Sequence, residues 1–233
     1  MPTLSELFRN IHRLRRHARD LQAEIERGPL QLKARQNFAT KQAAALQAAK
    51  DALKKKQVQV LDLESTLKST HETMQKYTRQ LSEVSDPKAY EALQHEIATA
   101  KAKSAELEEA ILNGMTEVDE MKAALPGHEE ASKKAAADLA AFDTDNKAKL
   151  ARLAEEMKRT QAELKTAEVE IPDEVRPEYV RRVASYGADA LAAVENGCCA
   201  YCRTGASQQQ VLNLHRGHFI TCTSCYRGLY LPE

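Results

Sequence analysis

Apolar residues recur every seven positions along the first 84 residues of the chain. A second ladder, three residues further on, is apolar near both of its ends and polar in the middle. Two such ladders form the seam of a coiled coil, and a repeat of seven that is kept this long predicts a left-handed supercoil. The first ladder consists of Leu4, Ile11, Ala18, Ile25, Leu32, Ala39, Leu46, Leu53, Val60, Leu67, Met74 and Leu81.

A second long helix is predicted to begin at Pro87, after a turn at residues 85–87. Asp86 is a favourable N-cap, and proline suits the first helical position because its missing N–H has no partner there. The seam pattern slips by one residue near Asn146 and ends before Pro172. It includes Tyr90, Leu93, Ile97, Ala100, Ser104, Leu107, Ile111, Gly114, Val118, Met121, Leu125, Leu139, Phe142, Leu150, Leu153, Met157, Thr160, Leu164, Ala167 and Ile171.

Two proline sites interrupt the predicted helices, at residues 28–29 and 126–127. Proline removes a backbone hydrogen bond, so we expect a kink at Gly28-Pro29 and a break or sharp kink at Pro126-Gly127. Polar seam residues, namely Arg35, Gln42 and Lys56, weaken the first seam. We therefore expect the 35–56 and 126–127 regions to be candidate docking sites for a partner.

The two predicted helices carry opposite charge. Residues 1–84 hold 16 Lys and Arg against 9 Asp and Glu, whereas residues 85–171 hold 12 against 19. A basic helix followed by an acidic helix of equal length favours pairing within one chain, while two like helices in parallel would repel. We therefore predict an antiparallel hairpin over residues 1–171, in a chain that is a monomer.

Residues 172–233 are predicted to form a short helix followed by a small β zinc ribbon. In the helix, Asp173 would act as the cap, and Tyr179 and Val183 would pack inward. The expected strands are residues 192–194, 209–214 and 219–221, with a turn at residues 215–218. The fold class is thus mainly α, with a long two-helix coiled coil and a small C-terminal β region beside its base.

All five cysteines lie between residues 198 and 225. Four form CxxC pairs, Cys199/Cys202 and Cys222/Cys225, with 19 residues between the pairs. Two such knuckles supply the four thiolates of a tetrahedral zinc site, and this spacing is a zinc signature. We expect one structural Zn²⁺, with Cys198 outside the ligand set. Cys198 could replace Cys199 through a CxxxC spacing, but CxxC is the commoner knuckle. Ligation by His215 or His218, reduced thiols and a disulfide are the alternatives.

These residues resemble the bacterial family of C4-type zinc ribbon proteins with an N-terminal coiled-coil hairpin. The resemblance rests on VSDPKAYEALQHEI (84–97) and on CAYC and CTSCYRGLY near the end. The family pattern CxxC…CxxCGRxLY is matched at Arg227, Leu229 and Tyr230 as well as at the four cysteines. Tyr226 stands where the family has glycine, and Gly228 where it has an apolar residue, so the second knuckle could close differently.

The resemblance implies a binding protein with no enzymatic activity. Described members are implicated in regulating flagella and type III secretion through the nitrogen-type alternative sigma factor and, in some, through RNA. For this chain it implies an adaptor or chaperone that binds partner proteins, such as a sigma factor or a secretion or flagellar component. A thiol redox protein that uses its CxxC pairs is an alternative.

A further alternative is a nucleic-acid binding protein. Basic residues near the expected base of the hairpin could contact phosphates, and Tyr201, Phe219, Tyr226 and Tyr230 could stack on bases, although packing of the ribbon explains them equally simply. The tentative binding residues are Arg13, Arg16, Arg181, Arg182, Arg216 and Arg227, near His12, Arg15, His17, Arg19 and Arg203.

Several functional classes lack their sequence signals. The chain has zero net charge, which implies no global attraction to nucleic acid. It has no P-loop, HExxH or GxSxG motif, so we expect no nucleotide or hydrolase site and no enzyme. Neither a signal peptide nor a membrane-spanning run is evident, and we expect a cytoplasmic protein.

Overall fold

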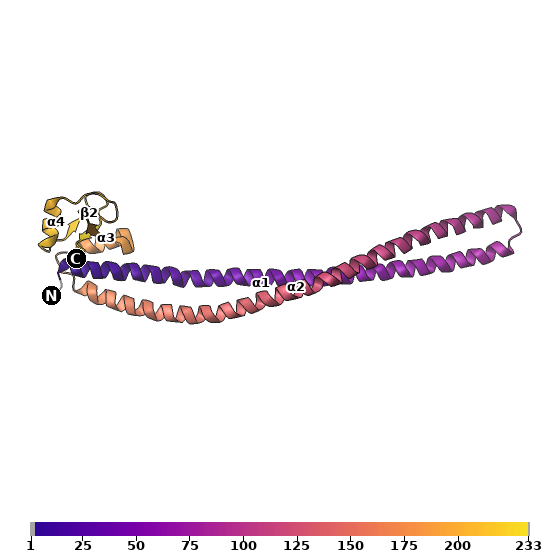
Figure 1. Ribbon diagram of the computed structural model, residues 1–233, viewed down its shortest axis with the longest axis horizontal. Helices are drawn as coiled ribbons and strands as arrows, with labels where there is room; N and C mark the ends of the chain where they lie inside the picture. The colour runs from indigo at the N-terminus through magenta and orange to yellow at the C-terminus, as the bar shows by residue number, and fades with distance from the viewer. Residues whose placement is uncertain (1–2, 233) are drawn as a thin grey trace. The chain divides into compact units, whose positions relative to one another are not determined.

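The computed structural model describes residues 3–232. Two long helices, α1 (Leu4–Glu83) and α2 (Pro87–Val169), run antiparallel and form a coiled-coil hairpin (Figure 1). Shorter elements follow: α3 (Arg176–Tyr186), a 3₁₀ turn (Gly187–Asp189), β1 (Leu191–Glu195), β2 (Cys198–Cys199), α4 (Gln208–His215), β3 (Ile220–Thr221) and β4 (Gly228–Tyr230). The predicted fold class, a helical hairpin with a small C-terminal strand region, is confirmed.

Side-chain caps define where both long helices begin. The Thr3 hydroxyl accepts a hydrogen bond from the Glu6 amide, and the Glu6 carboxylate accepts one from the Thr3 amide, which forms a capping box at α1. At α2 the Asp86 carboxylate accepts from the Ala89 amide at 3.2 Å, as predicted. Three residues, 84–86, separate the helices and reverse the chain.

Both internal prolines lie inside continuous helices. Pro29 is within α1 and Pro126 is within α2, and each helix continues for many turns on either side. Residues 126–127 therefore do not break α2, while the kinks expected at residues 28–29 and 126–127 stay predictions. A proline in a long helix costs about 3 kcal/mol, and the hydrogen bonds and packing of the flanking turns can offset that loss.

By internal contacts the chain divides into two compact units, which we treat separately. The central unit comprises Ala34–Ala141. Its core is thin: Val60, Ile111 and Val118 are its buried apolar cluster, and the side chain of Val60 faces Gly114 across the seam. The polar seam residue Lys56 forms an ion pair with Glu117 at 2.6 Å.

The terminal unit comprises the residues up to Lys33 and those from Phe142 on. Its main core joins the start of α1, the end of α2, α3 and the sheet. These elements lie near the labelled chain ends in Figure 1. Phe8 stacks on Tyr179 and meets Phe219 edge-on, with centroids 6.0 and 5.3 Å apart. Tyr179 is buried and Val183 packs against this core, as predicted.

Four short strands form a mixed sheet in the order β2-β1-β4-β3. β1 pairs antiparallel with β2 and parallel with β4, so that Ala192 lies opposite Leu229. β3 pairs antiparallel with β4. The central β1–β4 pair therefore joins strands that lie on opposite sides of all four CxxC cysteines in the sequence.

Two local predictions in this region are wrong. Residues 209–214 were expected to form a strand, but α4 spans Gln208–His215, because Ser207 and Gln210 form a capping box that starts a helix. Asp173 does not cap α3: the N-cap is Val175, without a side-chain hydrogen bond, and Asp173 instead pairs with Arg176 at 3.3 Å.

Candidate metal centre

The two CxxC segments fold into the same backbone turn. In the first, the Arg203 amide donates to the Cys199 carbonyl at 2.8 Å, and the Cys199 amide donates to the Thr204 carbonyl at 2.9 Å. In the second, the Tyr226 amide donates to Cys222 and the Cys222 amide donates to the Arg227 carbonyl, at 3.0 and 2.9 Å. Each turn directs its two thiols to one side.

Both turns place a non-glycine residue in the left-handed region. Arg203 and Tyr226, each directly after the second cysteine of its pair, have φ of 62° and 58°. This conformation favours glycine because it crowds the Cβ atom. The second knuckle thus closes like the first, and Tyr226 adopts the conformation for which glycine is suited.

Gly228 is buried because its neighbours leave no room for a side chain. A Cβ atom at this position would lie 2.8 Å from Leu191 and from Phe219. An apolar residue at this position, as in the family pattern, would require both neighbours to move.

The four knuckle cysteines converge on one point. Their Sγ atoms all lie within 4.8 Å of one another. Cys199 and Cys225 are 3.8 Å apart, and Cys202 and Cys222 are 3.6 Å apart. Thiolates around a metal with bonds of about 2.3 Å have Sγ–Sγ edges of about 3.8 Å. These residues therefore have the donor set and the spacing of a tetrahedral thiolate site.

The protonation of these thiols depends on their surroundings. Burial raises the pKa of Cys199 to about 12 and also raises the pKa of Cys222. Hydrogen bonds with Thr204 lower the pKa of Cys202 to about 6. Four thiolates in such close contact would repel one another, so complete deprotonation requires a cation between them.

Cys198 and the two turn histidines lie outside this group. Cys198 is half-buried in β2 and pairs with Glu195 across the sheet. His215 and His218 are both exposed. Among the described residues, the metal-binding cluster consists of the four knuckle cysteines alone.

The start of α1 packs directly against the cysteine-bearing region. The His12 Nδ1 lies 2.9 Å from the Tyr230 hydroxyl, and the Leu231 amide donates to the Ser5 hydroxyl. The Arg19 guanidinium pairs with Asp189 at 3.0 Å. A cavity of about 410 Å³ lies beside these contacts and is lined by His12, Arg16 and Tyr201, among others. Residues from the start of α1 and from the C-terminal region thus pack together around this cavity.

Four of the six arginines predicted to bind a partner or nucleic acid have contacts within the chain. Arg13 donates to Asn10, and Arg181 and Arg182 both pair with Glu178. Arg227 is buried: its Nε donates to the Asp189 carbonyl, and its guanidinium lies 3.2 Å from the centroid of the Tyr201 ring. Arg16 and Arg216 are exposed and form no ion pair with another described residue.

The four aromatic residues of this region divide into two groups. Tyr230 is buried, and Phe219 packs against the core. Tyr201 and Tyr226 remain more than half exposed, at 56% and 55%. Packing therefore accounts for Phe219 and Tyr230, and the contact with Arg227 holds the ring of Tyr201.

Sequence reasoning missed one polar cluster that joins three helices. Arg15 donates to the Tyr179 hydroxyl at 2.7 Å and pairs with Glu168, while that hydroxyl also donates to Glu168. Burial raises the pKa of Tyr179, which keeps its hydroxyl protonated. No sequence spacing indicates this cluster, because the three residues belong to α1, α2 and α3.

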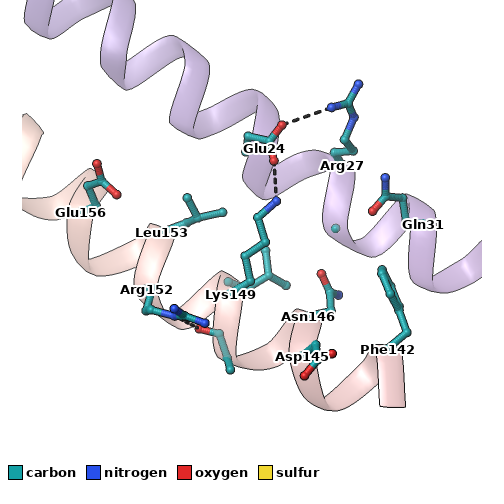
Figure 2. A pocket seen from close by; sticks show the side chains of 13 residues that line it. Glu24, Arg27, Gln31, Phe142, Asp145, Asn146, Lys149, Arg152, Leu153 and Glu156 are labelled. Atoms are coloured by element: carbon teal, nitrogen blue, oxygen red, sulfur yellow. Dashed lines mark hydrogen bonds and ion pairs between the residues drawn. The ribbon is translucent and has the colours of Figure 1, made fainter. Parts of the chain in front are cut away.

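A larger cavity of about 700 Å³ lies between α1 and α2 near Gly28. Figure 2 shows Glu24 reaching both Arg27 on its own helix and Lys149 on α2, at 3.2 and 2.6 Å. Asn146 is buried beneath Gly28, where an added Cβ atom would lie 2.7 Å from its Oδ1. Both acidic and basic side chains line the cavity, so it has no dominant charge.

Within residues 3–232, no helix has an apolar stretch long enough to span a membrane.

Comparison with known proteins identifies the architecture. Residues 4–187 match the CT398-like coiled coil hairpin domain. Over 98% of both chains, the structure is similar to CT398 from Chlamydia trachomatis, with a TM-score of 0.80 and 17% identity. It is also similar to the HP0958 protein from Helicobacter pylori, with a TM-score of 0.62 and 15% identity over 99% of both chains. No curated protein sequence matches the chain.

A third solved structure, from Mycobacterium smegmatis, has a TM-score of 0.57 and 18% identity over 98% of this chain and 99% of that one. At these identities, the likeness to all three structures concerns the fold.

Proposed function

Because the chain belongs to the CT398-like coiled-coil hairpin family, we propose that it is a zinc-stabilised adaptor without enzymatic activity. In this proposal Zn²⁺ holds the shape of the small C-terminal region. That region, together with the start of α1, binds a partner protein. The sequence resemblance suggests a sigma factor or a secretion or flagellar component as the partner.

The observation that carries the proposal is the convergence of four cysteine sulfurs within 4.8 Å. Zinc accepts four thiolates in a tetrahedron, and such a closed site leaves no position for a water molecule or substrate. A metal held in this way supplies folding free energy rather than chemistry. Cys199, Cys202, Cys222 and Cys225 would hold the ion.

The metal is tested by elemental analysis of the purified chain and by cobalt substitution. We expect one zinc per chain, and a Co²⁺ spectrum with the intense d–d bands of tetrahedral thiolate ligation. Cys222→Ser should lose the stoichiometric metal, while Cys198→Ser should keep it. Full zinc in Cys222→Ser, or none in the wild type, would contradict the proposal.

The partner is tested by affinity purification of the wild-type chain, with and without RNase, followed by mass spectrometry. Arg16→Glu is the informative variant because this side chain is exposed and lines the cavity beside Tyr230. We expect a protein partner that is retained after RNase treatment and is reduced by Arg16→Glu, with zinc content unchanged. Lys88→Glu, on the exposed first turn of α2, is the matched charge control.

The two alternative functions predict different results in the same experiments. A nucleic-acid binding protein would lose its bound material after RNase or DNase treatment, and its binding would weaken steeply with salt. Contacts within the chain already engage four of the six candidate arginines, which leaves Arg16 and Arg216 as the candidates without an ion pair to another described residue. A thiol redox protein would turn over a disulfide substrate while losing zinc on mild oxidation.

A further inference from the structure

An exposed apolar patch lies on the central unit. Leu61 of α1 and Leu112 and Met115 of α2 are 62%, 67% and 51% exposed, and Val58 lies at the edge of the patch. None of these residues belongs to the seam, whose buried residues here are Val60, Ile111 and Val118. Exposed apolar patches on an otherwise charged surface mark interaction sites.

Heptad spacing and two ion pairs place these residues on the same side of the hairpin. Lys50 pairs with Glu129 at 2.9 Å, and His71 lies 3.9 Å from Glu108. Lys50 and His71 are three heptads apart on α1, as are Glu108 and Glu129 on α2, so both contacts lie on the same side of the hairpin. Residues seven apart share a helix face, and Met115 is seven residues from Glu108. Leu112 is three residues before Met115 and is its neighbour on that face.

Leu61 lies on the same side of α1. The row that joins Lys50 to His71 in steps of seven passes through Gln57 and Glu64. Leu61 is four residues after Gln57 and three before Glu64, so it is next to that row. We call Leu61, Leu112 and Met115 the apolar face.

Charged side chains border the apolar face on both helices, namely Lys54, Glu64 and Lys68 on α1 and Glu108, Asp119 and Lys122 on α2. Basic residues outnumber acidic ones on α1 and the reverse holds on α2, where Lys122 pairs with Asp119 at 3.2 Å. Lys54 and Lys68 are each seven residues from Leu61, so α1 presents lysine on both sides of the leucine. On α2, Asp119 is seven residues after Leu112, and Glu108 is seven before Met115. Glu108 and Asp119 have side chains that are 57% and 76% exposed.

From this pattern we propose that the apolar face binds a second copy of the chain, with a two-fold axis parallel to the helices of the central unit. This rotation places α1 of each copy against α2 of the other. Because it shifts nothing along the helices, residues that are level within one copy are also level between copies. Lys54 and Lys68 of α1 then face Asp119 and Glu108 of α2 at both contacts.

The register of the seam specifies which residues meet. The Val60 side chain faces Gly114, at 2.8 Å from where a Cβ atom would lie, so these two residues are level. Counting from this pair in opposite directions along the two antiparallel helices, Leu61 is level with residues 112–115. In the proposed dimer it is therefore level with the same residues of the second copy. Lys54 is level with Asp119 and Lys68 with Glu108, each within roughly 3 Å along the axis.

The alternative two-fold axis, perpendicular to the helices, is disfavoured by charge. It would place α1 against α1 in opposite directions, so that Lys54 of one copy would approach Lys68 of the other. Like charges at close range repel. Charge complementarity therefore favours a second copy as the partner, with the two-fold axis parallel to the helices.

The proposed dimer differs from the monomer that the sequence alone predicts. That prediction concerned like helices pairing along the seam, and the intramolecular hairpin already occupies the seam. A face of three apolar side chains with charged borders is smaller than a standard interface of about 800 Å² per partner. We therefore expect a weak dimer, with a Kd on the order of 10–100 μM at low salt.

Sedimentation equilibrium of the zinc-loaded full chain, from about 1 to 500 μM, tests the proposal. We expect the wild type to shift from monomer to dimer, and Leu61→Glu or Leu112→Glu to raise the Kd at least tenfold. Leu30→Glu, at a leucine that is 69% exposed on the terminal unit, is the matched control and should dimerise like the wild type. A wild type that remains monomeric throughout, or a dimer unaffected by both variants, overturns the proposal.

A charge exchange tests the orientation. The double variant Lys54→Glu/Lys68→Glu should raise the Kd, and adding Glu108→Lys/Asp119→Lys should restore it. In a mixture of ¹⁴N- and ¹⁵N-labelled chains, carbodiimide should cross-link Lys54 to Asp119 between differently labelled chains. Failure of the charge exchange to restore dimerisation, or cross-links confined to single chains, contradicts this arrangement. Zinc content reports independently on the metal site, so the two proposals can fail separately.

Discussion

The central and terminal units of this chain have very different cores. In the central unit, residues Ala34–Ala141 bury an apolar cluster of only three residues, and ion pairs such as Lys56–Glu117 help to specify the register. The terminal unit buries Phe8, Ile11, Ile171, Leu191 and other large side chains in one cluster. Its second cluster contains the cysteines, including the buried Cys199 and Cys222.

The difference shows that the two units are stabilised in different ways. In the central unit, a regular helical repeat distributes stability over many weak contacts. Single substitutions there should have small effects, except where the helices approach most closely. In the terminal unit a few buried side chains and one cluster of four cysteines connect short strands that could not form a stable sheet by themselves. Single substitutions there should be severe and local.

The largest expected effect comes from removing the metal. Cys222→Ser, or treatment with a strong chelator, should unfold residues 195–232, because structural zinc supplies on the order of 10 kcal/mol of folding free energy in small domains. The circular dichroism signal of α1 and α2 should remain largely intact. Hydrogen exchange with mass spectrometry, with Cys198→Ser as the control, would locate the loss.

Protection of β1 and β4 that survives zinc removal would show that the terminal unit does not need the metal. If instead the long helices lose their protection too, the two units are more strongly coupled than their separate cores indicate.

The next largest effect is expected from Phe8→Ala. Phe8 is 1% exposed and contacts both Tyr179 and Phe219, so its removal should cost about 3–5 kcal/mol. Chemical denaturation followed by tyrosine fluorescence would measure the loss in the terminal unit. Phe38→Ala in the central unit is the matched control. Because Phe38 is 57% exposed, this change should cost less than about 0.5 kcal/mol.

Two glycines of α2 sharpen the comparison within the central unit. A Cβ atom at Gly114 would lie 2.8 Å from Val60 Cγ2, whereas nothing lies within 4 Å at Gly127. Gly127→Ala should stabilise the helix by roughly 0.5–1 kcal/mol. Gly114→Ala should destabilise by about 1–2 kcal/mol because of the clash, and adding Val60→Ala should relieve that clash. Thermal melts of the single and double variants would show the opposite signs.

A smaller effect is expected at Tyr226 of the second knuckle. Its φ of 58° strains a side chain and suits glycine, so Tyr226→Gly should stabilise the terminal unit by about 0.5–1 kcal/mol. Denaturation in the presence of zinc would measure it. The corresponding Arg203→Gly, where φ is 62°, should behave alike, and opposite signs for the two variants would show that the knuckles are not equivalent.

The smallest effect concerns the pH dependence of stability. Burial, followed by the nearby Arg16, lowers the pKa of His12, so the folded chain keeps this imidazole neutral. An unfolded histidine titrates near about 6.5, and below that pH the unfolded state binds a proton that the folded state does not. Stability should therefore fall as the pH drops from 7 through 6.

His12→Asn should reduce that fall in stability. Protonation of the four cysteines contributes equally to the wild type and the variant, so the difference between them reports on His12. Melting temperatures of both chains at a series of pH values would isolate the histidine. Parallel curves for the two proteins would assign all of the pH dependence to other groups.

The sequence predicted the regular parts of the molecule well and the irregular parts poorly. Heptad spacing and Asp86-Pro87 located both long helices to within a few residues, because these signals are local and repeated. The four cysteines were singled out by spacing, and the structure brings them together. The strand predicted over residues 209–214 is instead the helix α4, because the Ser207–Gln210 capping box favours the start of a helix.

Other features depend on contacts that no local pattern encodes. The parallel pairing of β1 with β4 joins segments on opposite sides of both knuckles. The cluster of Arg15, Glu168 and Tyr179 joins three helices through charges that are ordinary in each helix alone. The engagement of Arg227 by Tyr201 and by the Asp189 carbonyl is of the same kind.

The contact between His12 and Tyr230 joins residues 218 positions apart and has a kinetic consequence. Closing a flexible loop of that length would carry an entropic cost of about 5 kcal/mol. A hairpin that forms first brings the end of α2 back to the start of α1 and leaves only a short segment to search for its place. Folding of the terminal unit should therefore await the hairpin, and changes that slow the turn at residues 84–86 should delay assembly of the distant sheet.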